Sequence, residues 1–201
     1  MEGIINFAGV MPRIGTTTQA LQLARYIQSC SDYKTAYVEC NSQDYIWSAS
    51  EMYQAVKQDP TGGHVTIEGI DMYVNSRLPE LTAGGVDIDF LICDYGDMTL
   101  SGFNRTDFLK GTVKVLAAGI KPNEIHFTEN ALRDPALNDA MYIFTHTLES
   151  DREEISGLMG KHAADTFFTP YIPDPFKTMD DAAIAYFEKM IPRIIEKIQK
   201  M

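Results

Sequence analysis

The chain has 201 residues, 45% of them hydrophobic and 22% charged, which is ordinary for a globular protein. This length predicts one domain, residues 1–201, with a substantial core. The formal net charge of −11 disfavours broad electrostatic binding to nucleic acid or to an anionic membrane. No apolar run approaches the roughly 18 residues of a membrane span, and the three cysteines show no metal-binding spacing. We therefore expect a cytoplasmic protein.

Strand-like and helix-like patterns alternate along the chain. Strands are expected at residues 3–8, 35–40, 90–94, 112–118, 141–145 and 166–168. Helices are expected at residues 17–28, 46–57, 122–133, 150–162 and 179–200. Several of the strands are almost continuously apolar, as in a parallel sheet that is buried on both faces. The pattern predicts an α/β fold with a doubly wound, mostly parallel sheet flanked by helices.

Three segments add detail to this plan. Residues 64–67 and 70–74 are strand-like and flank Glu68-Gly69, which predicts a small β-hairpin insertion near 64–74. The proline-rich residues 170–175 are expected to be irregular. The last helix mixes acidic with basic residues, which favours a packed helix over one that lies on a membrane. Its apolar residues recur at helical spacing and predict one buried stripe: Ile184, Phe187, Ile191, Ile194, Ile195 and Ile198.

The first strand leads into a turn, residues 9–18, and then into an amphipathic helix. A strand, a glycine-containing turn and a hydroxyl-rich helix start form the layout of a phosphate-binding loop, in which backbone N–H groups and the helix N-terminus face an anion. A lysine usually follows the last glycine of such a loop, but here Thr16 follows Gly15. The candidate nucleotide-binding residues of this loop are Arg13, Ile14, Gly15, Thr16, Thr17 and Thr18.

A carboxylate at the end of a second buried strand completes the expected site. Residues 87–94 form an apolar strand candidate that ends at Asp94. An isolated Asp in this place is typical of a loop cap or an Asx-turn. Beside a phosphate loop, however, Asp94 and the Thr17 hydroxyl are the predicted Mg²⁺ ligands.

The order of these motifs resembles the ParA/MinD class of P-loop ATPases, a deviant Walker A family that includes the TadZ/CpaE-like proteins. Residues 11–18 stand where the family loop reads Lys-Gly-Gly-Val-Gly-Lys-Thr-Thr, and residues 35–43 and 89–97 resemble its first and second switches. Residues 170–173 resemble the segment near the adenine, so Pro173 is a candidate nucleotide contact. The resemblance implies a P-loop NTPase-like fold, ATP or ADP with Mg²⁺, a homodimer, and protein partners in a bacterial secretion, pilus or conjugation machine.

The chain departs from the family at charged positions. The signature lysine that reaches across a dimer falls at Met11, and the loop lysine falls at Thr16. The first-switch Asp associated with water activation falls at Asn41, while Glu39 keeps a carboxylate two residues earlier. Asn hydrogen-bonds water but is not an anionic base. Because losing one charge-stabilising group costs on the order of 3–4 kcal/mol of barrier, slow hydrolysis or none is expected.

The residues leave three hypotheses open. The first is a degenerate nucleotide-binding or pseudo-ATPase protein that acts as a localisation or scaffold component. The second is an active, slow Mg²⁺-dependent ATPase in which Arg13, or an Arg from a partner, replaces the loop lysine. The third is a protein-interaction module that binds no nucleotide. Hydrolysis assays and nucleotide titrations separate the three.

Overall fold

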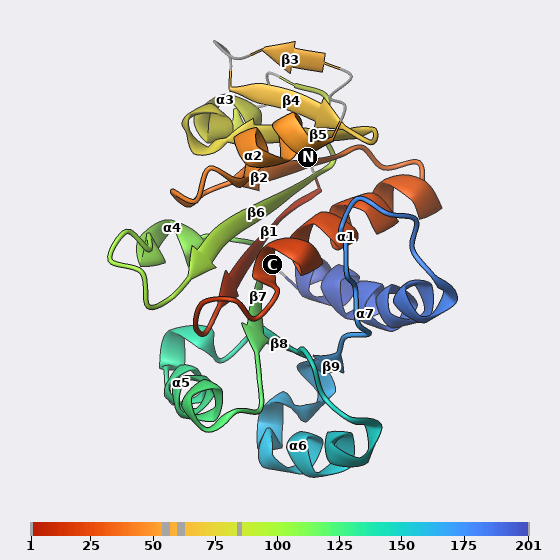
Figure 1. The fold of residues 1–201 in the computed structure, drawn as a ribbon. Helices are drawn as coiled ribbons and strands as arrows, with labels where there is room; N and C mark the ends of the chain where they lie inside the picture. The colour runs from red at the N-terminus through yellow and green to blue at the C-terminus, as the bar shows by residue number, and fades with distance from the viewer. Residues whose placement is uncertain (1, 54–56, 60–62, 84–85, 201) are drawn as a thin grey trace.

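The computed structural model describes residues 2–53, 57–59, 63–83 and 86–200. Nine strands of these residues form one sheet in the order β3-β4-β5-β2-β6-β1-β7-β8-β9 (Figure 1). From β5 to β9 in this order neighbouring strands are parallel, whereas β4 runs antiparallel to both of its neighbours. The strands are β1 (Gly3–Gly9), β2 (Thr35–Glu39), β3 (Lys57–Asp59), β4 (His64–Ile67), β5 (Ile70–Val74), β6 (Phe90–Asp97), β7 (Val113–Ala118), β8 (Met141–Phe144) and β9 (Thr166–Phe168).

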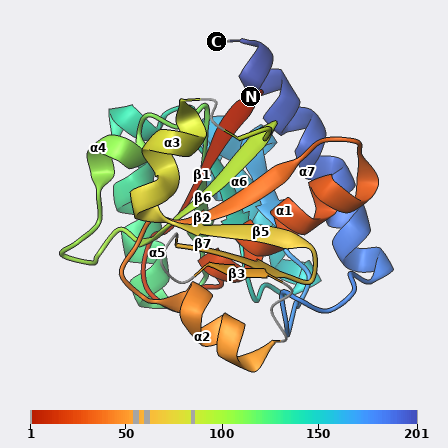
Figure 2. The ribbon, with the colours of Figure 1, turned by 90° about the horizontal axis from the view of Figure 1, so that it is seen from above.

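Helices cover both faces of the sheet. α1 and α7 lie side by side against one face in Figure 1 and Figure 2, and α4 and α5 lie on the opposite face. The helices of the described residues are α1 (Thr16–Cys30), α2 (Tyr45–Met52), α3 (Leu78–Thr82), α4 (Arg105–Phe108), α5 (Pro122–Leu132), α6 (Arg152–Leu158) and α7 (Asp181–Gln199). The doubly wound architecture predicted from the sequence is confirmed.

The central strands are buried on both faces, as their apolar sequences predict. Every residue of β2, β6, β7 and β8 is buried. From β1 the chain passes through α1 to β2 on one side, whereas from β6 it passes through α4 to β7 on the other. In sheets of this type, ligands bind at the carboxyl ends of the strands next to such a reversal. The fold therefore directs attention to the loop that follows β1.

The predicted hairpin is present and belongs to the main sheet. Its turn residues Glu68 and Gly69 have φ angles of 48° and 81°, the left-handed pair that a two-residue hairpin turn needs. β5 pairs with β2, and β3 adds a further strand beyond β4. The insertion thus lengthens one edge of the sheet.

Two predicted helices differ in extent from the observed ones. The helix expected at 46–57 ends at Met52, and Lys57 begins β3, because antiparallel pairing with β4 prevails over helical periodicity there; residues 54–56 lie outside the described part. The prediction of one continuous helix at 150–162 was wrong. This segment is divided into a 3₁₀-helix, α6 and a second 3₁₀-helix, and Gly160, with φ of 54°, interrupts it.

The last helix is packed, as predicted. Phe187, Met190 and Ile194 are buried, and Arg193 of α7 pairs with Asp165 at 2.8 Å. Ile195 was expected in the buried stripe but is 43% exposed. Within the residues that the structure describes, no helix combines the length and the apolar composition needed to cross a membrane.

Candidate functional site

The loop between β1 and α1 forms one wall of a cleft at the carboxyl edge of the sheet. Gly15, immediately before α1, has a φ of 83°, a conformation that favours glycine. In the described residues no side chain caps the N-terminus of α1, so its first N–H groups face the cleft. The cleft has a volume of about 250 Å³ and is closed on its other side by Gln43, Tyr45 and Asp97. Its walls suit an anion at the helix N-terminus.

The loop is poor in positive charge, as its sequence predicts. The Thr16 hydroxyl lies over Gly9 so closely that a Cβ on that glycine would be 2.6 Å from it. Thr16 therefore turns toward β1 instead of extending across the cleft. Arg13 is exposed, has a φ of 62°, and is the one basic residue among those described that line the cleft. One exposed guanidinium is thus the basic group that the described residues bring to the cleft.

Asp94 is completely buried and does not itself line the cleft, but it contacts Thr17, which does. Thr17 Oγ1 donates a hydrogen bond to Asp94 Oδ2 at 2.6 Å, and the Tyr37 phenol donates to the same oxygen at 2.8 Å. The backbone N–H of Gly96 donates to Asp94 Oδ1 at 2.8 Å. Burial raises the pKa of Asp94, while these three hydrogen bonds oppose that rise. The structure thus brings the two predicted metal ligands into contact and adds a tyrosine to them.

Asp97 supplies a second carboxylate to the cleft. It is 2% exposed, and its Oδ1 accepts a hydrogen bond from the Thr99 backbone N–H at 3.0 Å. In the described part of the chain, its buried Oδ2 has no hydrogen-bond partner. A buried carboxylate oxygen without a donor costs free energy. Asp97 is therefore ready to accept a donor or a cation that enters the cleft.

The donor set fits Mg²⁺ held jointly by protein and phosphate. Thr17, Asp94 and Asp97 offer the oxygen atoms that this ion prefers, and Mg²⁺ usually binds through one or two carboxylates together with substrate phosphates. Among the described residues no group of three or more His, Cys, Asp or Glu converges as a metal cage. The arrangement thus fits Mg²⁺ bound together with a nucleotide.

The two first-switch candidates hold the local backbone. Glu39 is buried, and its carboxylate accepts hydrogen bonds from the backbone N–H groups of Tyr45 at 2.7 Å and Ile46 at 3.1 Å, at the start of α2. Burial raises the pKa of Glu39. Asn41 donates to the Asp94 carbonyl at 3.0 Å and accepts from the Gln43 N–H at 3.0 Å. Both side chains fix the loop around Asp94, and neither lines the cleft.

The irregular segment before α7 crosses α1. Gln22 of α1 donates to the Pro175 carbonyl at 2.6 Å, and Phe176 packs against the Tyr53 ring with centroids 4.5 Å apart. Pro173 is exposed in this segment and does not line the cleft. The segment is irregular, as expected, and ties α1 to the end of α2.

Tyr37 and Tyr45 are site residues that the sequence did not reveal. Tyr37 lies within an apolar strand, where a tyrosine is typical of core packing, and only the pairing of β2 with β6 brings its phenol to Asp94. Burial raises its pKa far above the usual value, so the phenol stays protonated and donates. Tyr45 opens α2 and lines the cleft. The sequence feature that could have indicated Tyr37 as a site residue is its position two residues before Glu39, near the end of the strand.

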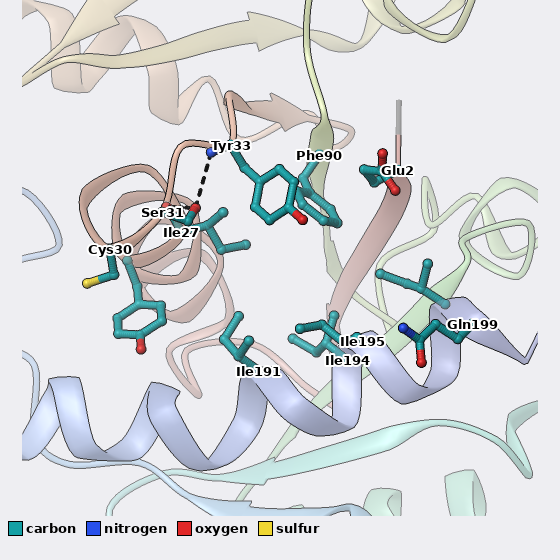
Figure 3. A pocket seen from close by; sticks show the side chains of 12 residues that line it. Glu2, Ile27, Cys30, Ser31, Tyr33, Phe90, Ile191, Ile194, Ile195 and Gln199 are labelled. Carbon is teal, nitrogen blue, oxygen red and sulfur yellow. Dashed lines mark hydrogen bonds between the residues drawn. The ribbon is translucent and has the colours of Figure 1, made fainter.

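A second cavity of about 340 Å³ lies at the opposite end of the strands (Figure 3). Ile191, Ile194 and Ile195 of α7 face Tyr33 and Phe90 across it. Tyr33 and Phe90 contact edge to face with centroids 5.1 Å apart. Since Phe90 begins β6, this apolar cavity is remote from the phosphate loop and takes no part in the cleft.

Comparison with solved structures identifies the fold. A chain of the MinC:MinD cell division protein complex from Aquifex aeolicus matches with a TM-score of 0.65 at 12% identity, over 98% of this chain and 94% of that chain. A putative plasmid partition protein from Borrelia burgdorferi, bound to AMPPNP, matches with a TM-score of 0.70 at 12% identity, over 96% and 98%. A ParA family ATPase from Chlorobium tepidum matches with a TM-score of 0.56 at 11% identity, over 100% of both chains.

Sequence comparison adds nothing to this. No protein-family model matches the chain, and no curated protein matches it in sequence. At identities of 11–12%, the likeness to the solved structures shows the fold alone. The chain has the P-loop NTPase fold of the ParA/MinD ATPases.

Proposed function

We propose that this protein binds ATP or ADP in a degenerate phosphate loop and acts as a localisation or scaffold component of a bacterial secretion, pilus or conjugation machine. The open N-terminus of α1, beside Thr17 and Asp94, supports nucleotide binding. The similar partition protein bound to AMPPNP supports the same ligand class. The scaffold role is supported by the resemblance of the loop and switches to TadZ/CpaE-like proteins.

The hydrogen bonds of Asp94 carry the proposal that catalysis is weak or absent. Its two oxygens accept from Thr17, Tyr37 and Gly96, so three protein donors already satisfy the carboxylate. A divalent ion that binds Asp94 Oδ2 competes with the Tyr37 phenol for that oxygen, while the Thr17 hydroxyl oxygen keeps lone pairs of its own. Without a loop lysine, the described cleft also offers little compensation for the charge that develops on transferred phosphate.

In this proposal different residues contact the phosphates, Mg²⁺ and the adenine. The backbone of Arg13, Ile14 and Gly15 and the first turn of α1 hold the phosphates, with Thr16 and Thr18 at the edge of the cleft. Thr17 and Asp94 hold Mg²⁺, which neutralises phosphate charge when it is bound. Pro173 is proposed to contact the adenine.

An active ATPase is the second candidate, and two observations favour it. The Arg13 guanidinium is exposed at the cleft and forms no ion pair with the described residues. Asp97 Oδ2 is buried and has no partner among them, so it can accept a hydrogen bond from a water in the cleft. Turnover then depends on Arg13, or on an Arg from a partner, because Asn41 supplies no anionic base.

Protein partners and a homodimer belong to the same proposal. The similar Aquifex aeolicus chain comes from a complex of two proteins, MinC and MinD. Met11 lines the cleft where the family has its cross-dimer lysine, so a dimer of this chain is proposed to use contacts that do not need nucleotide. Its cytoplasmic location stays a prediction.

Titration of the full chain with ATP and ADP, with and without Mg²⁺, tests the function. We expect micromolar to submillimolar binding and no hydrolysis above the rate of a Thr17→Ala control. Mg²⁺-dependent turnover that is lost in both Thr17→Ala and Arg13→Ala would reject the pseudo-ATPase in favour of the second candidate. Absence of binding at millimolar nucleotide would leave only the nucleotide-free interaction module.

A further inference from the structure

A groove with a mainly apolar lining lies between α5 and α6 near the carboxyl edge of the sheet. It has a volume of about 340 Å³, and its floor is formed by Ile120 and Phe144, at the ends of β7 and β8. Figure 1 shows α5 and α6 as neighbouring helices at the end of the molecule that lies away from the hairpin. The nucleotide cleft and this groove share no lining residue.

Both walls of the groove have the periodicity of a helix-packing face. α5 lines it at positions 125, 128, 129 and 132, and the other wall lines it at 151, 154, 155 and 158. Each set is an i, i+3, i+4, i+7 series, the spacing by which one helix packs against another. Two such faces on either side of an apolar floor match the helix-in-groove mode of peptide recognition.

The rim of the groove exposes large apolar side chains. Leu158 is 76% exposed and Ile125 is 46% exposed. Leu132 and Ile155 lie deeper and are half-buried. Exposed apolar side chains that gather around a hollow mark interaction sites more often than scattered ones do. An occupant that covered Leu158 and Ile125 would remove their apolar surface from water.

The charges around the groove select the occupant. Glu129, Asp151 and Glu154 line it, and no lysine or arginine is among the described residues that do so. Glu129 pairs with Arg133 at 2.9 Å, while Glu154 forms no ion pair with the described residues. We infer that the α5–α6 groove is a docking surface for a basic amphipathic helix of a partner protein. Its apolar stripe fills the hollow, and its lysines or arginines face the carboxylates.

Other occupants fit less well. An acyl chain with a carboxylate head, or an anionic membrane, meets three carboxylates at the rim. A second copy of this chain has the same net charge of −11. The basic residues Arg193 and Lys197 of its last helix already pair with Asp165. A cationic helix from another protein is the occupant that this charge distribution attracts.

Synthetic helices and the full-length chain test the inference. The probe is a fluorescent peptide of about 18 residues with Leu at i, i+3, i+4 and i+7 and Lys elsewhere, a length of five turns. The controls are a peptide with Glu in place of Lys and a scrambled Leu/Lys peptide of the same composition. We expect the first peptide to bind with an affinity that falls at high salt, and both controls to bind at least about tenfold more weakly.

Matched variants locate the site. Leu158→Asp should weaken binding of the Leu/Lys peptide by at least about tenfold, because it places a charge in the apolar contact. Met52→Asp is the control, since Met52 is 79% exposed on α2 and outside the groove; it should change affinity less than about twofold. Glu154→Lys should weaken binding severalfold at low salt and less at high salt.

Three outcomes would overturn the inference: equal binding of the Leu/Glu peptide, unchanged affinity in Leu158→Asp, or a dimer of the free chain that Leu158→Asp dissociates. The inference deepens the scaffold role proposed above, and nucleotide titrations keep the two apart. Leu158→Asp should bind ATP as the unaltered chain does. If no variant binds nucleotide but the peptide result holds, the nucleotide proposal fails and the docking surface stands.

Discussion

The cleft beside α1 and the groove between α5 and α6 lie near the same edge of the sheet but differ in how their groups are satisfied. In the cleft, the carboxylate of Asp94 accepts from Thr17, Tyr37 and Gly96 and is fully buried. In the groove, Leu158 and Ile125 are exposed, and Glu154 has no ion pair within the described residues. At the cleft, Asp94 has three protein donors and only Asp97 Oδ2 is left without a partner among the described residues, whereas the groove leaves large apolar side chains exposed.

The contacts of the cleft contribute to the free energy of folding, whereas the exposed side chains of the groove contribute to the free energy of association. Hydrogen bonds to a buried carboxylate stabilise the fold, since breaking them leaves donors and acceptors without partners. Exposed leucine and glutamate contribute little to folding and gain their value only on binding. Substitutions in the cleft should therefore change stability, and substitutions in the groove should change association.

The largest effect is expected for Asp94→Ala. The substitution leaves the Tyr37 phenol and the Gly96 N–H buried without an acceptor and frees the Thr17 hydroxyl. We expect the free energy of unfolding to fall by about 3–5 kcal/mol, measured by urea denaturation. Glu154→Ala, at an exposed groove carboxylate, is the matched control and should stay within about 0.5 kcal/mol. Equal losses in both variants would remove the contrast.

A smaller effect is expected for Tyr37→Phe. Loss of the phenol removes one donor from Asp94 Oδ2 and should lower the free energy of unfolding by about 1 kcal/mol. The freed oxygen should bind Mg²⁺ more readily, so Mg²⁺ should strengthen nucleotide binding more in the variant than in the unaltered chain. Isothermal titration calorimetry with and without Mg²⁺ measures this.

Tyr142→Phe provides the control for that substitution. Tyr142 is also fully buried, in β8, but its hydroxyl has no hydrogen-bond partner among the described residues. Its removal should cost little stability and leave the Mg²⁺ effect unchanged. If Tyr142→Phe were as destabilising as Tyr37→Phe, the hydrogen bond to Asp94 would not be the cause.

Much of the fold could be predicted from the sequence, because buried parallel strands have almost continuously apolar sequences. The loop and the partnership of Thr17 with Asp94 followed from local motifs, and the structure places these side chains 2.6 Å apart. The role of Tyr37 could not be predicted, since its contact depends on the pairing of β2 with β6. For the same reason, the sequence did not predict the partners of the Glu39 carboxylate, which lie at the start of α2.

The groove was hidden from the sequence for a different reason. The acidic residues Glu149, Asp151, Glu153 and Glu154 have the sequence pattern of a solvated helix start, which gives no sign of a groove. The local sequence does not give the distance between α6 and α5. That distance is set by the two crossovers on one face of the sheet. An amphipathic face is visible in the local sequence, but only the folded chain shows that no element of the described residues covers it.

The smallest effect, and one of opposite sign, is expected for Gly157→Ala in α6. A Cβ at Gly157 meets no atom within 4 Å in the described structure, and alanine favours a helix over glycine by roughly 0.5–1 kcal/mol. The chain should become more stable by about this amount in urea denaturation, with peptide binding retained. Gly15→Ala is the counterpart in the cleft, where a φ of 83° makes alanine strained and destabilising. Stabilisation at Gly15, or destabilisation at Gly157, would contradict the assignment of a left-handed backbone to Gly15 and of an uncrowded helical position to Gly157.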